Sequence, residues 1–446
     1  MLVAFVARIH LGLLALGLLC SVATSVAHAQ LPPYWSGTTA AFYELPTEDI
    51  QNRALGSVYR FQRFTPSAVL TANSDGVIAY RILYVSMDAN GDKRLVSGAL
   101  LMPVRVYAPQ RPILGLAVGS QGMADACASS RGIATSTNYD LTYMRMALDL
   151  GWAVAVTDYQ GLGTTVNTFP ASVTDEHVQV VGTVLGRNVL DSVRAARLLN
   201  TQFNNDRAAY FPWKFAISGN MSLSSKVVLW GYSEGGAASA WAGELQPTYA
   251  PELKLVGVAA GGVPADMLRV GRAINNPSNI QNVSFGALVA ASIGYAEAYE
   301  ELRGDLAQAN LSNTGWSLVS NVKEQCLVEQ ILEGFGGYTA QELTADGSNL
   351  LDDPLWQARF DENKLGYGKP PVPVFLYHGV LDEAIEYNQA RDLARSYCNQ
   401  GVRVNWNPYF GDHVTGYVQG MGAALDFLNN RVNGWFTNAI VCSAIY

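Results

Sequence analysis

A serine stands between two glycines at residues 231–235, where the chain reads Gly-Tyr-Ser-Glu-Gly. The apolar run Val227–Trp230 precedes this motif, and a stretch of small residues, Gly236–Ala242, follows it. The order predicts a strand, a sharp turn and a helix, with the hydroxyl group of Ser233 presented at the turn. Such a hydroxyl can attack a carbonyl carbon as a nucleophile if a base removes its proton.

Histidine is the usual base, and three histidines follow the N-terminal leader described below: His177, His378 and His413. In a strand–turn–helix site of this kind the serine comes first in the chain, then the acid, then the histidine. His177 precedes Ser233, and His378 ends a predicted strand ahead of the candidate acid, where we expect a packing role. His413 follows the last predicted strand and is the predicted base.

The acid should lie in the loop after the preceding strand, and residues 379–383 occupy that loop. Asp382 is the candidate, because a carboxylate there would hold the imidazole in the correct tautomer and stabilise the imidazolium ion. Glu383 is a rival in the same loop. Asp412 adjoins the histidine, but we expect its side chain to point away, and Asp266, after an earlier strand, is a more remote alternative.

Acyl transfer also needs hydrogen-bond donors for the oxyanion that develops in the transition state. The backbone amide of Glu234, the residue after the serine, is one expected donor. The second should come from a loop that follows an early strand. Two loops compete for this role, at residues 118–122 and 158–161.

The first 29 residues have the pattern of a signal peptide. Arg8 supplies a basic start, Leu11–Val22 is nearly all apolar, and Ala27–Ala29 provides small residues for cleavage after Ala29. An uncleaved anchor is the alternative, but a spanning helix needs about 20 apolar residues. No other segment has that length and character, so we expect a secreted protein, extracellular or periplasmic, with no transmembrane segment after cleavage.

The charge balance excludes some classes of partner. The chain has 29 Lys and Arg against 37 Asp and Glu, a formal net charge of −8. This acidic balance argues against nucleic acid as a partner and against charge-driven binding to anionic surfaces. It leaves neutral lipid open.

Four cysteines follow the leader, and an even number in an exported protein predicts two disulfides. Three pairings are possible, and we favour Cys127 with Cys326 and Cys398 with Cys442. None of the four stands in a C-x-x-C pair, so the sequence indicates neither a zinc site nor a redox site, and no metal is predicted.

Strands and helices alternate along most of the chain, after a loop-rich lead-in at residues 30–75 and a predicted hairpin of Val77–Ser86 with Leu95–Leu101. This alternation predicts an α/β fold with a mostly parallel, doubly wound sheet. Ligands bind at the carboxyl ends of such strands. The further strands are predicted at Pro112–Val118, Trp152–Thr157, Leu253–Ala259, Val372–Tyr377 and Val402–Trp406, and the helices at Tyr143–Leu150, Val181–Leu199 and a C-terminal segment with Phe427 and Trp435.

The alternation stops between about residues 264 and 369, where the pattern is helical, as in Phe285–Ala298. We therefore predict a core formed by residues 30–263 and 370–446, with an inserted helical cap at 264–369. Two compatible interpretations of the cap stay open: an ordinary packed helical subdomain, and a mobile lid that presents apolar surface to the substrate.

Five stretches together resemble the secretory lipase family of α/β-hydrolases. They are Gly-Trp-Ala-Val-Ala-Val-Thr-Asp-Tyr-Gln-Gly-Leu-Gly at 151–163, Gly-Tyr-Ser-Glu-Gly-Gly at 231–236, Ala-Ala-Gly-Gly-Val-Pro-Ala-Asp at 259–266, Tyr-His-Gly-Val-Leu-Asp at 377–382, and Asp-His at 412–413. One departure is Val118-Gly119-Ser120, where many relatives have His-Gly-Thr, and it affects the expected shape of the acyl pocket.

The resemblance implies an α/β-hydrolase fold whose helical cap lies between the sixth and seventh core strands. It implies Ser233 as nucleophile, Asp382 as acid and His413 as base, with an oxyanion hole formed by Asp158 and Glu234. The expected activity is that of a triacylglycerol lipase or esterase that needs no cofactor. Its substrate would be a lipid or small ester, met in transient contact with a lipid–water interface.

Two other functions stay open at this point. The same three residues can cleave amides, so a serine peptidase is the first alternative, although no acidic clamp for a peptide amine is evident. The second is a binding protein on a hydrolase scaffold that has lost its activity.

Overall fold

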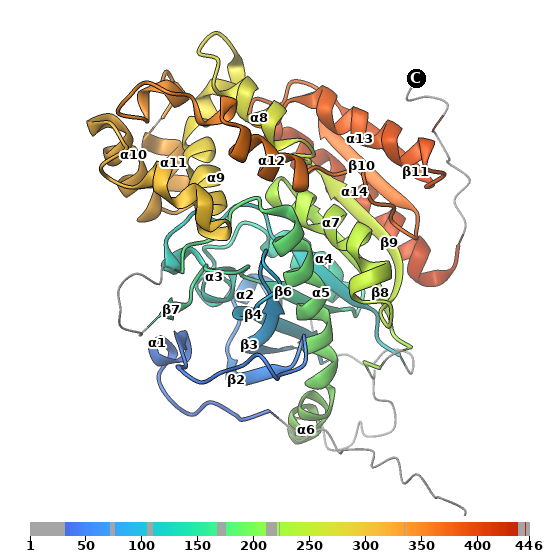
Figure 1. The fold of residues 1–446 in the computed structure, drawn as a ribbon. Coiled ribbons are helices and arrows are strands. Elements are labelled where there is room, and N and C mark those ends of the chain that lie inside the picture. The colour runs from blue at the N-terminus through green and yellow to red at the C-terminus, as the bar shows by residue number, and fades with distance from the viewer. Residues whose placement is uncertain are drawn as a thin grey trace, which may run out of the picture. The chain divides into compact units, whose positions relative to one another are not determined.

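The described residues of the computed structural model contain a nine-stranded sheet in the order β11-β10-β9-β8-β5-β6-β4-β3-β2 (Figure 1). The structure describes residues 32–71, 76–104, 110–166, 175–210, 221–222, 224–333, 335–435 and 442, which belong to one compact unit. The signal peptide predicted at residues 1–29 lies outside the described residues.

One half of the sheet is antiparallel. β2 (Val58–Phe64), β3 (Val77–Met87) and β4 (Lys93–Pro103) pair in sequence, and β4 then pairs antiparallel with β6 (Ala153–Thr157). The predicted hairpin is thus confirmed as β3 and β4.

The prediction of a loop-rich lead-in was wrong for β2. Two arginines interrupt the apolar pattern of this strand, and the structure shows how one of them is accommodated. Arg60 is only 8% exposed, donates from Nε to the Phe42 carbonyl at 3.1 Å, and its guanidinium carbon lies 4.6 Å from the Trp35 ring centroid. The partners of the Arg60 guanidinium come from outside the strand, so the residue pattern of the strand alone could not predict them.

The other half of the sheet is parallel, as predicted. It consists of β6, β5 (Ile113–Ala117), β8 (Lys226–Tyr232), β9 (Lys254–Gly261), β10 (Val374–Gly379) and β11 (Val404–Tyr409). Every residue of β5 and β6 is buried, which is why these strands read as continuous apolar runs.

Helices cover both faces of the parallel strands. On one face, Leu229 of β8 and Val193 of α5 lie 2.8 and 3.0 Å from the point where a Cβ on Gly115 would be. The neighbouring residue Trp230 points the other way and stacks on Tyr143 of α4, with ring centroids 4.1 Å apart. This doubly wound arrangement leaves the carboxyl ends of the strands as the place for a site.

The described core also contains helices and short strands outside the main sheet. They are α1 (Thr39–Phe42), β1 (Glu44–Leu45), α2 (Ala68–Thr71), η1 (Asp125–Cys127), α3 (Ser129–Thr135), α4 (Leu141–Asp149), β7 (Thr165–Val166), α5 (Gly182–Leu198), α6 (Asn200–Tyr210), α7 (Glu234–Tyr249), α13 (Tyr387–Asn399) and α14 (His413–Asn433). The last helix was predicted to include Trp435, but Gly434 ends it in a left-handed conformation (φ 74°) and Trp435 lies beyond it.

Between β9 and β10 the described residues form helices and no element of the main sheet. Figure 1 shows these helices, yellow to orange, gathered together on one side of the molecule. The helix predicted at Phe285–Ala298 is present as α9 with those bounds. The others are α8 (Met267–Ile274), η2 (Ile280–Ser284), η3 (Glu300–Leu306), α10 (Asn313–Lys323), α11 (Leu327–Glu333), η4 (Ala340–Glu342), η5 (Leu350–Asp352) and α12 (Pro354–Glu362). The division into a core and a separate cap stays a prediction.

Candidate active site

Ser233 occupies a strained turn between β8 and α7, with φ 59° and ψ −125°. Few non-glycine residues adopt positive φ, and such strain persists only where the surroundings hold it. In this turn the Ser233 amide donates to the Gly261 carbonyl at 2.9 Å. A Cβ on Gly231 would lie 2.1 Å from the Gly235 carbonyl oxygen, and one on Gly235 would lie 2.1 Å from that of Ala117. The flanking glycines are therefore required by close backbone approach.

His413 and Asp382 are joined by a hydrogen bond. Nδ1 of His413 lies 2.7 Å from Oδ2 of Asp382. Because a carboxylate can only accept, Nδ1 carries the proton, and Nε2 is the acceptor nitrogen of the neutral ring. His413 is the first residue of α14, and Asp382 follows β10, so both lie beyond carboxyl ends of strands. His413 and Ser233 line the same cavity.

The surroundings of Asp382 favour its charged form. Burial alone would raise the pKa of Asp382, but the charge of His413 and hydrogen bonds from His378 and His413 hold it well below the usual range. Its Oδ1 also accepts from the amides of Ala384 and Ile385, at 2.9 and 2.7 Å. Burial acts to lower the pKa of His413, but the neighbouring Asp382 carboxylate outweighs it, so the pKa is raised.

The three rival carboxylates have other hydrogen-bond partners. Glu383 accepts the backbone amide of His413 at 2.9 Å, and so positions the start of α14. Asp412 caps α14 by accepting from the Thr415 amide at 2.7 Å. Asp266 caps α8 and forms an ion pair with Lys364 at 2.8 Å. Among these carboxylates, Asp382 is the one bonded to the His413 ring.

His378 has a larger role in the site than the sequence analysis expected. It is fully buried, and its Nε2 lies 3.0 Å from the Ile385 carbonyl oxygen and 3.2 Å from Oδ2 of Asp382. Two acceptors face this nitrogen, so Nε2 carries a proton. The spacing of four residues between His378 and Asp382, across the end of a strand, was the signal that could have indicated the contact.

The assignment of Asp158 to the oxyanion hole is corrected by the structure. Its backbone amide donates to the Ser97 carbonyl at 2.9 Å, and its buried carboxylate accepts from the hydroxyl of Ser97 and the amide of Ser130, each at 2.7 Å. Asp158 is not among the residues that line the cavity with Ser233. The physical reason is strand order: β6, which precedes Asp158, is separated from β8 by β5.

The loop after β5 lies against the serine turn instead. Ser120 lines the cavity, and a Cβ on Gly119 would lie 3.3 Å from the carbonyl oxygen of Tyr232. Glu234 begins α7, so its amide is one of the first-turn amides that have no partner within the helix. Of the two loops that competed in the sequence, the loop at residues 118–122 is the one that lies beside Ser233.

The cavity has a volume of about 520 Å³ and two kinds of wall. The core contributes most of the polar groups, including Ser233, His413 and Ser120. The helices between β9 and β10 contribute mostly apolar side chains, among them Met267, Val270, Ile274, Leu288, Leu327 and Ile331.

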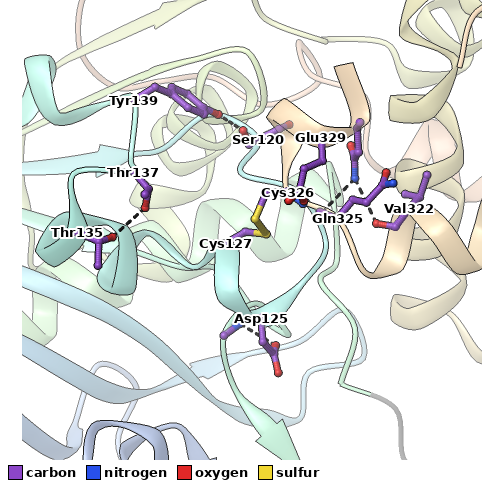
Figure 2. Close-up of a disulfide and its surroundings, with 12 residues drawn as sticks. Ser120, Asp125, Cys127, Thr135, Thr137, Tyr139, Val322, Gln325, Cys326 and Glu329 are labelled. Carbon is purple, nitrogen blue, oxygen red and sulfur yellow. Dashed lines mark hydrogen bonds between the residues drawn. A yellow bond between two sulfur atoms is a disulfide. The ribbon is translucent and has the colours of Figure 1, made fainter. Parts of the chain in front are cut away.

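Two disulfides are present, with the pairing that the sequence analysis favoured: Cys127 with Cys326, and Cys398 with Cys442. Figure 2 shows the first of them joining the segment after β5 to the start of α11. None of the helices in the described part of the chain is long and apolar enough to cross a bilayer. Within that same part, no group of three or more His, Cys, Asp or Glu residues is placed to hold a metal ion.

The model of the secretory lipase family matches residues 126–438. The chain belongs to this family. It is 25% identical over 414 residues to secreted triacylglycerol lipase LIP1 of Malassezia furfur, covering 89% of this chain and 76% of the relative. It is 26% identical over 419 residues to lipase 5 of Candida albicans, covering 88% and 80%. A relative from Mycobacterium tuberculosis, 26% identical over 404 residues, covering 88% and 82%, is described as a probable inactive lipase.

The fold of this family member is that of a solved lipase. The structure resembles Candida antarctica lipase A in its closed state with a TM-score of 0.74 and 22% sequence identity, covering 90% of this chain and 87% of the other. The predicted α/β-hydrolase fold is thereby confirmed.

Proposed function

We propose that this protein is a secreted serine carboxylic-ester hydrolase, a triacylglycerol lipase or esterase. The observation that carries the proposal is the bond between Asp382 and His413 at a cavity that also holds Ser233 in a strained turn. The predicted signal peptide and the names of the secreted relatives support export.

The proposed reaction has two halves. Oγ of Ser233 attacks the ester carbonyl carbon while Nε2 of His413 takes its proton, and Asp382 stabilises the imidazolium ion that forms. The amide of Glu234 and the loop at 118–122 would hold the oxyanion. His413 then gives the proton to the departing alcohol, which leaves an acyl group on Ser233. Water attacks this acyl-enzyme with His413 again as base, releasing the acid and restoring the hydroxyl.

The apolar cavity walls indicate that the substrate carries an apolar acyl group. An alkyl chain placed against apolar walls is removed from water, which stabilises it by about 0.8 kcal/mol per CH₂ group. Most of the polar groups come from the core, which also holds Ser233, where the ester would react. This division of the cavity fits a lipid ester better than a peptide.

The cavity is also bordered by exposed apolar side chains. Val283, Ile331 and Val414 line it while remaining 59%, 67% and 66% exposed. Each has an exposed apolar neighbour three or four residues away on its own helix: Ile280, Val328 and Val418. These six residues, called the apolar rim, would contact a lipid surface as substrate enters.

The test is hydrolysis of a p-nitrophenyl ester. Ser233→Ala should lower kcat by roughly 10⁶-fold, and His413→Ala by a similar factor. Ser317→Ala, on α10, serves as the matched control and should keep full activity. Undiminished hydrolysis by a folded Ser233→Ala variant would exclude the proposal.

Two further measurements separate the alternatives. A peptidase would hydrolyse aminoacyl anilides as well as esters, whereas we expect esters alone to react. Glu383 lines the cavity but is already bonded to the His413 amide, so it offers no evident clamp for a peptide amine. A binding protein without activity would fail to be labelled by a fluorophosphonate, which we expect to label Ser233.

A further inference from the structure

We infer that the hydroxyl group of Ser120 is a third hydrogen-bond donor to the oxyanion, and that Gln179 aims it. The inference rests on the proposed function, because it concerns the transition state of ester hydrolysis at Ser233.

The strand register brings Ser120 to the serine turn. β5 pairs in parallel with β8, with Ala117 opposite Gly231, so both strands end at the same edge of the sheet. Gly119 then lies against Tyr232, as described above, and Ser120 and Ser233 line one cavity. A donor on Ser120 therefore lies on the same side of the cavity as the nucleophile.

The backbone around Ser120 is held from several sides. The Tyr139 hydroxyl donates to the Ser120 carbonyl, as Figure 2 shows, and the Gly119 amide donates to Oδ2 of Asp140 at 3.0 Å. A donor fixed in this way before the reaction needs little reorganisation when charge develops, which is the condition for effective stabilisation.

The following residues are attached to the start of α11. Met123 donates to the Gln325 carbonyl at 3.0 Å, and Leu327 donates to that of Gln121 at 2.8 Å. The disulfide between Cys127 and Cys326 links the same two segments covalently, as Figure 2 shows. The start of α11 thus restrains the loop that contains Ser120.

The hydroxyl oxygen of Ser120 already accepts one hydrogen bond. Nε2 of Gln179 donates to Oγ of Ser120 at 2.7 Å. A hydroxyl has one proton and two acceptor sites, so this bond uses an acceptor site and leaves the proton for another partner. Because Ser120 lines the cavity, that partner would be a substrate oxygen. No proton is transferred: the hydroxyl keeps its proton throughout.

The segment that contains Gln179 is held by Glu234, the residue after the nucleophile. Gln179 is 4% exposed, and its neighbour Val180 has φ 53°, which is a rare conformation for a β-branched residue. The Val180 amide donates to Oε1 of the buried Glu234 side chain at 2.9 Å. Glu234 would therefore serve the oxyanion twice: directly through its amide, and through its side chain by holding the segment that aims Ser120.

The effect should appear in kcat rather than in KM. A carbonyl oxygen in the bound substrate is a weak acceptor, whereas the oxyanion is a strong one, so the hydrogen bond strengthens as the reaction proceeds. Ser120→Ala should lower kcat for p-nitrophenyl butyrate by about 10²-fold with little change in KM. Ser120→Thr keeps the hydroxyl and should therefore lose clearly less kcat than Ser120→Ala.

A second variant leaves Ser120 in place. In Gln179→Glu the new carboxylate can only accept, so the Ser120 proton turns toward residue 179 and away from the substrate. We expect a loss of about tenfold or more in kcat. Activity equal to that of the unmodified enzyme would contradict the role given to Gln179.

Inhibitor affinity provides an independent readout. A trifluoromethyl ketone adds to the serine and forms a charged oxyanion, so Ser120→Ala should weaken its binding by about the factor lost in kcat. Thermal melting establishes that each variant is folded. A folded Ser120→Ala variant with unchanged kcat and unchanged inhibitor affinity would overturn the inference. If Ser233→Ala is inactive in the same assay, that result leaves the proposed function standing, whereas an active Ser233→Ala variant would remove both.

Discussion

Nε2 of His378 lies 3.2 Å from Oδ2 of Asp382, the same oxygen that accepts from Nδ1 of His413 at 2.7 Å. One carboxylate oxygen therefore contacts two histidines. Since His378 is buried and its Nε2 is also directed at the Ile385 carbonyl, it holds the Asp382 side chain toward His413 from the strand side. We regard His378 as a positioning residue, because it acts through Asp382.

His378→Ala is expected to lower kcat by about tenfold, equivalent to about 1.4 kcal/mol in the activation barrier. The loss follows from removing one hydrogen bond that favours the charged form of Asp382. His378→Gln keeps a donor and should recover part of the activity. A pH profile of kcat/KM distinguishes positioning from packing, because only positioning shifts the acid limb. A loss as deep as that of His413→Ala would make His378 part of the reacting set.

The pH dependence should follow the raised pKa of His413. The imidazole must be neutral to accept the serine proton, so activity is lost as pH falls through this pKa. We expect the midpoint of the acid limb of kcat/KM to lie above about 6.5, the ordinary value for histidine. Asp382→Asn removes the charge that raises the pKa, so the midpoint should move to lower pH and kcat should fall by roughly 10⁴-fold. If the midpoint of the acid limb were the same in Asp382→Asn as in the unmodified enzyme, the pairing of Asp382 with His413 would be contradicted.

Two glycine substitutions should change stability in opposite directions. A Cβ on Gly235 would lie 2.1 Å from the Ala117 carbonyl oxygen, so Gly235→Ala should destabilise the fold by about 3 kcal/mol and abolish activity. Gly422 is exposed in α14 with nothing within 4 Å of such a Cβ. Gly422→Ala should therefore stabilise by about 0.5–1 kcal/mol through helix propensity. Denaturant unfolding measures the free energy of unfolding of both variants. Equal changes in the two variants would contradict the close approach of Gly235 to the Ala117 carbonyl.

The apolar rim should matter at an interface and not in solution. Ile331→Ser combined with Val414→Ser should reduce hydrolysis of an emulsified triacylglycerol several-fold, because burying each side chain on contact with lipid would contribute about 1.5–3 kcal/mol. Hydrolysis of a dissolved short-chain ester should change little. Leu355→Ser, on α12, is a control, since that side chain is 55% exposed but does not line the cavity. Equal losses on both substrates would point to damage within the cavity.

Much of this molecule is encoded in local patterns. The alternation of buried strands and amphipathic helices predicted the parallel half of the sheet, and Gly231 and Gly235 around Ser233 predicted the sharp turn. The roles of Ser233, Asp382 and His413, which their order in the chain predicted, stay a proposal that the bond between Asp382 and His413 supports. The predictions of the sheet and of the turn succeeded because side-chain period and turn chemistry act between residues a few positions apart.

What the amino-acid sequence could not decide was which segments become neighbours. It offered the loops at 118–122 and 158–161 as equal sources of an oxyanion donor, and family resemblance favoured Asp158. The strand order distinguishes the two loops, because β5 lies beside β8 and β6 lies one strand further away, where the Asp158 amide donates to the Ser97 carbonyl. The contacts of Ser120 with Gln179 and of Asp382 with His413 arise in the same way. They depend on how segments far apart in the chain converge, and no spacing along the chain records that convergence.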